Sequence, residues 1–114
     1  MIQKTVFLTS IDTGSVGLGF VGENEHIQIV IKCDSVFDAH PSATVSMLVK
    51  SPSGTIYEPD TMTLDGNNVV WTITDSDTGS SGGGQFQLTF TDGTEVMKSA
   101  IASTTVSPSI IASF

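Results

Sequence analysis

QFQLTFTDGTEVMK, residues 85–98, is the stretch that decides the fold. Phe86, Leu88 and Phe90 alternate with polar residues, which is the period of a strand that buries one of its two faces. Asp92-Gly93 then supplies residues that favour a tight turn, and an apolar pattern resumes at Val96. The sequence therefore predicts a β-hairpin here.

The same period of two recurs on either side of this hairpin. It is clearest at residues 27–32, where three isoleucines alternate with other side chains, and turn residues such as Ser51-Pro52-Ser53-Gly54 separate the segments. We predict an all-β fold, an antiparallel immunoglobulin-like β-sandwich of about seven to nine short strands. One such domain should span residues 1–114. The expected strands are 4–10, 27–32, 43–50, 55–58, 61–64, 68–74, 85–91, 95–98 and 100–106.

The inward positions of these strands predict the core. Two glycine-rich segments, residues 17–22 and 75–84, are predicted to be loops, with a short helical turn at the start of the second. Cys33 continues a strand pattern and is predicted to be a small core residue. The remaining predicted core residues are Val6, Leu8, Ile27, Ile29, Ile31, Val45, Val49, Val69, Trp71, Ile73, Phe86, Leu88, Phe90, Ala102 and Val106.

The charge balance excludes two classes of partner. Four lysines and no arginine stand against twelve acidic residues, for a formal net charge of −8. Nucleic acid and anionic membranes both attract clustered basic residues, so we expect neither as a partner. The apolar run within residues 1–8 is too short for a signal peptide or a transmembrane segment, and neither is expected.

Two motifs resemble ligand-binding sites, and we interpret both as parts of loops or turns. Residues 17–22 match G-x-G-x-x-G, but the segment that follows alternates as a strand, whereas a dinucleotide site needs a helix there. No cofactor is therefore expected. Asp75 and Asp77, with Asp60 or Asp65, could offer oxygen ligands to calcium, and the alternative is that they cap and solvate turns. We favour the second interpretation and predict no metal site.

Catalysis would require a nucleophile beside an oriented base. His26 opens a strand and His40 precedes a proline, so both are predicted to be exposed turn residues, and no catalytic residue is assigned. The chain is expected not to be an enzyme. Trp71 and Tyr57 are the aromatic side chains that could instead form a platform for a ligand, as in an immunoglobulin-like carbohydrate- or surface-binding module, which is the alternative function. Since Trp71 lies within a strand and is predicted to be a core residue, Tyr57 is the platform candidate.

Three large apolar residues follow the last expected strand. Ile110, Ile111 and Phe114 come after Pro108, which should end that strand. They could fold back on the core, or they could contact a partner subunit. We name them as possible partner-contact residues.

The order of turns and strands between Leu48 and Ser109 follows a known pattern. It runs through LVKSPSGT (48–55), NVVWTITDSDT (68–78), a glycine, FQLTF (86–90), Asp92-Gly93 and a closing strand to Val106. This order resembles the amino-terminal domain of the phage baseplate upper protein family, found in tail proteins of phages and prophages of Gram-positive bacteria.

The resemblance implies a structural role without catalytic residues. The domain would attach a receptor-binding or fibre assembly to the phage tail, either by itself or as the N-terminal domain of a longer tail protein. Its expected partners are other tail or baseplate proteins, including further copies in a homo-oligomer. Its expected location is the virion tail, after synthesis in the bacterial cytoplasm.

Overall fold

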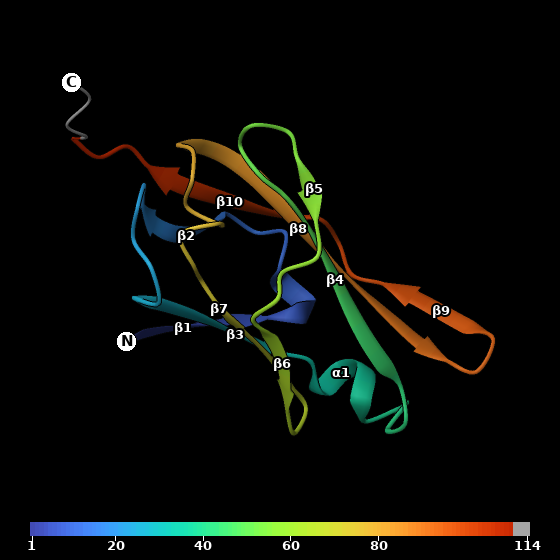
Figure 1. Ribbon diagram of the computed structural model, residues 1–114. Helices are drawn as coiled ribbons and strands as arrows, with labels where there is room; N and C mark the ends of the chain where they lie inside the picture. The colour runs from blue at the N-terminus through green and yellow to red at the C-terminus, as the bar shows by residue number, and fades with distance from the viewer. Residues whose placement is uncertain (111–114) are drawn as a thin grey trace.

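The computed structural model describes residues 1–110 and consists almost entirely of strands (Figure 1). Alternating β-branched and aromatic residues form these strands because such side chains pack well on a pleated surface. The only helical elements described are the short turns η1 (Leu8–Ser10) and α1 (Asp34–Phe37). The strands are β1 (Ile2–Phe7), β2 (Ser15–Phe20), β3 (Ile27–Lys32), β4 (Thr44–Lys50), β5 (Ile56–Tyr57), β6 (Met62–Asp65), β7 (Asn68–Thr72), β8 (Gly82–Asp92), β9 (Glu95–Lys98) and β10 (Ala102–Ser107).

The strands form two sheets, which confirms the all-β prediction. One sheet has the order β1-β3-β7-β6, and the other has the order β2-β10-β8-β4-β5, with β9 added to β8. Both sheets are mixed, because β1 pairs in parallel with β3 and β2 pairs in parallel with β10. The prediction of a purely antiparallel sandwich was therefore wrong. Side-chain alternation reports which face of a strand is buried and carries no information on the direction of its neighbour.

The core lies between the two sheets and is close to the predicted one. Twelve of the fifteen listed positions are buried, while Val6, Leu8 and Val45 are partly buried against the core, and Cys33 is buried as predicted. Trp71 packs edge-on against Phe86, with ring centroids 5.6 Å apart. Further core residues that the sequence did not single out are Ile11, Leu18, Phe37, Ala43 and Met47.

Both segments predicted to be glycine-rich loops contain strands. Residues 15–20 form β2, and Gly82–Gly84 begin β8, so the prediction of loops was wrong at these places. Gly84 is buried where β8 runs between β4 and β10. A glycine is compatible with a strand where a neighbouring backbone approaches closely. The glycine-rich sequence pattern carries no information on such an approach. Residues 75–78 do form the predicted turn, with the Thr78 amide donating to the Thr74 carbonyl at 3.2 Å.

The long strand β8 makes the domain elongated. Its first half pairs with β10 and its last residues pair with β9, so the β8–β9 hairpin extends beyond the sandwich (Figure 1). The hairpin predicted at Asp92-Gly93 is thereby confirmed. Phe37 of α1 packs edge-on against Phe90 at the base of this hairpin, with centroids 5.7 Å apart. Among residues 1–110, no helix has the length and apolar character needed to cross a membrane.

Candidate functional site

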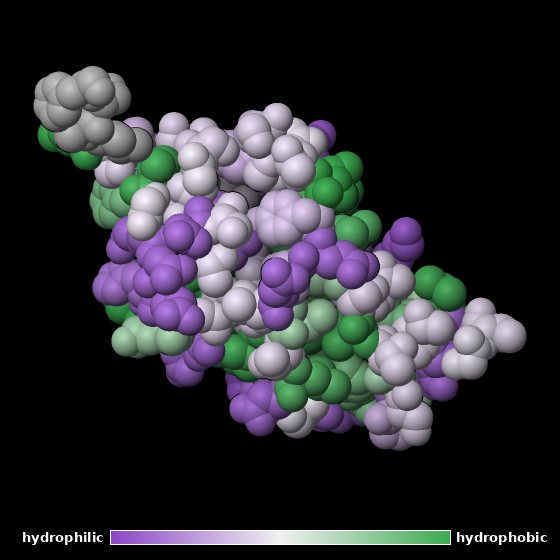
Figure 2. All heavy atoms as spheres, viewed as in Figure 1, coloured by the Kyte–Doolittle hydropathy of each residue, from purple (hydrophilic) through white to green (hydrophobic). Residues whose placement is uncertain are grey.

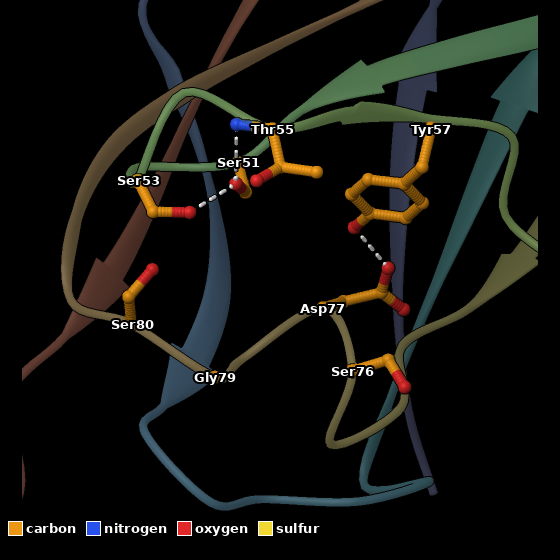
Figure 3. Close-up of a pocket in the computed structure, with 8 residues that line it drawn as sticks. All are labelled: Ser51, Ser53, Thr55, Tyr57, Ser76, Asp77, Gly79 and Ser80. Carbon is orange, nitrogen blue, oxygen red and sulfur yellow. Dashed lines mark hydrogen bonds between the residues drawn. The ribbon is translucent and has the colours of Figure 1, made fainter.

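The candidate site is a pocket between the β4–β5 hairpin and the turn that precedes β8 (Figure 3). Its volume is about 420 Å³. The hairpin turn is held by short polar contacts, including a 2.8 Å hydrogen bond between the hydroxyls of Ser51 and Ser53. Most of the lining side chains carry hydroxyl groups. The lining residues are Ser51, Ser53, Thr55, Tyr57, Ser76, Asp77, Gly79 and Ser80.

Asp77 links the two walls of this pocket. Its carboxylate accepts a hydrogen bond from the Tyr57 hydroxyl, and its second oxygen accepts from the Thr74 amide at 2.9 Å and the Thr74 hydroxyl at 3.2 Å. Thr74 and Asp77 thus form the backward half of a capping box, in which an acidic side chain satisfies the free amide at the start of a turn. Asp77 is buried, with only 4% of its surface exposed, and its hydrogen bonds hold the turn against β5.

Tyr57 is half-buried and partly packed against the core. Burial, the hydrogen bond to Asp77 and the charge of Asp77 all raise the pKa of the Tyr57 phenol, so it keeps its proton and donates at neutral pH. Its hydroxyl is therefore hydrogen-bonded to Asp77, and part of its ring packs against the core. Tyr57 borders the pocket rather than standing out from the surface as an isolated platform (Figure 3).

The two aspartates considered for calcium have different surroundings. Asp75 is exposed, and its backbone amide donates to the Asn24 side chain at 3.1 Å, whereas Asp77 faces Tyr57 and Thr74. In the described part of the chain, no three His, Cys, Asp or Glu side chains are grouped to hold a metal ion. The contacts of Asp77 agree with the interpretation as a turn-capping residue.

Both histidines lie beside acidic side chains. His26 lies 3.6 Å from Glu23, and half of its side chain is exposed. His40 has its Nδ1 atom 3.0 Å from Asp92 and 3.3 Å from Glu95, and only 26% of its side chain is exposed. His40 therefore joins the segment after α1 to the β8–β9 hairpin, which is a larger structural role than the exposed turn residue predicted from the sequence.

Cys33 lies in the core with no exposed surface. Burial raises the pKa of its thiol to about 11. At pH 8 the thiolate, which is the reactive form, is then about a hundredfold scarcer than for a thiol that titrates near 9. We expect a thiol reagent to label native protein at least about a hundredfold more slowly than urea-unfolded protein. Equal labelling rates in the two states would contradict this placement of Cys33.

The structure describes one of the three candidate contact residues at the C-terminal end. Ile110 is fully exposed beyond β10, where the Ser109 hydroxyl donates to the Val21 carbonyl at 2.8 Å. Ile111 and Phe114 lie outside the described residues. A partner contact through these residues stays a prediction.

Comparison with known proteins identifies a solved structure with a similar fold. A solved structure described as the N-terminal domain of phage TP901-1 ORF48 matches with a TM-score of 0.57, over 94% of this chain and 99% of that one. The chain has the fold of a phage protein domain. At 11% sequence identity the likeness concerns the fold alone. No protein-family model and no curated protein matches the sequence, so the resemblance to the baseplate upper protein family stays a prediction.

Proposed function

We propose that this chain is a structural domain of a phage tail or baseplate that attaches a receptor-binding or fibre assembly to the tail. The observation that carries the proposal is the likeness in fold to a phage protein's N-terminal domain, which extends over nearly the whole length of both chains. The order of turns and strands between Leu48 and Ser109 independently points to the same class of protein. Its partners would be other virion proteins and its location the virion tail.

The proposal includes no catalytic step. The cysteine and the two histidines have structural surroundings: Cys33 is buried, His26 lies beside Glu23, and His40 lies beside Asp92 and Glu95. The alternative of a carbohydrate-binding module has less support. An aromatic platform offers an exposed ring face, and Tyr57 is half-buried with its hydroxyl bound to Asp77.

The proposal predicts that the protein is part of the phage particle. Antibodies raised against the purified chain should label one end of the tail in electron micrographs of particles released by the host that carries the gene. Antibodies absorbed with the purified chain should give no label. Particles that contain their other tail proteins but carry neither the label nor peptides of this chain would contradict the proposal.

A further inference from the structure

The outer face of the six-stranded sheet has an unusual composition. Strand register places the side chains of alternate residues in β4, β8, β9 and β10 on this face, away from the core. Most of them are hydroxyl or amide side chains. Among them lie Lys50 and Lys98 and the exposed apolar residues Leu48 and Val96, whose exposed fractions are 50% and 58%. Ile56 of β5, which pairs with Lys50, is 63% exposed and lies on the same face.

This outer face carries no carboxylate, although the chain has twelve acidic residues. Strands β2, β4, β5 and β10 contain no acidic residue at all. Asp92 and Glu95, at the ends of β8 and β9, point to the opposite face, where His40 lies within 3.3 Å of both. Among the described residues, neither Lys50 nor Lys98 lies within ion-pair distance of an acid.

Five of the twelve acidic residues gather on the loops at another end of the molecule. The β2–β3, β5–β6 and β7–β8 connections meet there. The Glu25 amide donates to the Ile73 carbonyl and the Asp75 amide donates to Asn24, while Asn24, Asp60 and Asp75 line one shared hollow. Figure 2 shows hydrophilic side chains gathered over the first two of these connections. We call this region the acidic end. Its carboxylates are Glu23, Glu25, Glu58, Asp60 and Asp75.

From this separation of charge we infer that the outer face docks the acidic end of a second copy of the chain. Lys50 and Lys98 then face carboxylates of the neighbouring copy, and Leu48, Ile56 and Val96 supply apolar contact. A symmetric contact of two outer faces is disfavoured, because it brings four lysines and no acid into one interface. Because the two surfaces differ, the contact is head-to-tail and forms a ring or an open chain. The inference rests on the assembly role proposed above and names the surfaces used.

The test is the solution mass measured by light scattering across a protein concentration series at low salt. We expect the mass of the unaltered protein to rise with concentration and the association to weaken with added salt. Reversing both charges, Lys50→Glu with Lys98→Glu, should lower the association constant at least about tenfold. Reversing Glu58→Lys with Asp75→Lys at the acidic end should have the same effect. Lys32→Glu, on the other sheet, is the control and should associate normally.

Mixing the two double variants separates a head-to-tail contact from a symmetric one. In the equimolar mixture an intact outer face meets an intact acidic end, and a Glu-bearing outer face meets a Lys-bearing acidic end, so both contacts again pair opposite charges. A head-to-tail contact should therefore be restored and grow beyond a dimer, whereas a mixture that stops at a dimer would indicate a symmetric contact of outer faces and would overturn the inference. A mixture that stays monomeric, or lysine variants that associate as well as the unaltered protein, would overturn the inference. Labelling of phage tails by the antibodies would stand in either case, so failure of this inference is distinguishable from failure of the proposed function.

Discussion

Replacing Asp77 with alanine should lower the free energy of unfolding by about 3 kcal/mol. The Asp77 carboxylate is buried and accepts hydrogen bonds from the Tyr57 hydroxyl and from the amide and hydroxyl of Thr74. Alanine leaves these donors without their acceptor at a largely buried position, and hydrogen bonds to a charged group are the stronger class. Urea unfolding followed by the fluorescence of Trp71, the single tryptophan, measures the loss.

Asp75→Ala is the matched control, because Asp75 belongs to the same acidic pair and is exposed. Its contact to Asn24 uses the backbone amide, which alanine retains, so stability should change by no more than about 0.5 kcal/mol. Asp77→Asn should fall between the two, because its amide oxygen can still accept from Thr74 while its NH₂ group donates to the Tyr57 hydroxyl. Equal losses for Asp75→Ala and Asp77→Ala would contradict the assignment of Asp77 as the link between β5 and the turn.

The strands with strict alternation were predictable from the sequence. Residues 27–32 and 95–98 form strands with the predicted bounds, and the inward positions of residues 86–90 are buried. Alternation works here because each sheet faces the core on one side only, so the burial pattern repeats every two residues. Trp71 and Cys33 were placed in the core for the same reason.

The elements that the sequence did not reveal depend on contacts between distant segments. In strand β2 the apolar residues Val16, Leu18 and Phe20 do alternate with smaller ones, but the glycines between them disfavour a strand, and β2 forms because β10 offers it an edge to pair with. The parallel pairing of β1 with β3 likewise depends on tertiary arrangement, which a local pattern does not encode. Propensity is a weak guide wherever a neighbouring strand supplies the hydrogen bonds.

The candidate site was predictable only in part. The Thr74-x-x-Asp77 spacing is a capping signature that can be seen in the sequence, and it supports the interpretation of Asp77 as a turn residue. Its second partner, Tyr57, lies 20 residues away on another strand. The contact between His40 and Asp92 spans 52 residues. Neither pairing has a local sequence signal, because each follows from how the sheets stack.

Replacing Gly84 with valine should lower the free energy of unfolding by about 3 kcal/mol. A Cβ atom at Gly84 would lie 2.5 Å from the Lys50 carbonyl oxygen and 2.8 Å from the Thr104 hydroxyl. The first of these is backbone of β4, so the clash is relieved only if β4 and β8 separate and weaken the hydrogen bonds between them. The core is close-packed, and shifts of this kind propagate into it. Urea unfolding monitored by Trp71 fluorescence gives the measurement.

Gly83→Val is the matched control, one residue away in the same strand. Gly83 is exposed, and a Cβ atom there lies 3.9 Å from the nearest neighbouring atom, the Thr104 carbonyl oxygen. Valine also favours strands and reduces the freedom of the unfolded chain, so stability should stay within about 1 kcal/mol of the unaltered protein. Both glycines lie in the same strand, and only Gly84 lacks room for a side chain. A difference in stability between the two variants therefore reports the steric clash at Gly84 rather than the change in backbone freedom. If Gly84→Val proved as stable as Gly83→Val, residues 82–84 would be a loose connection rather than the packed start of β8.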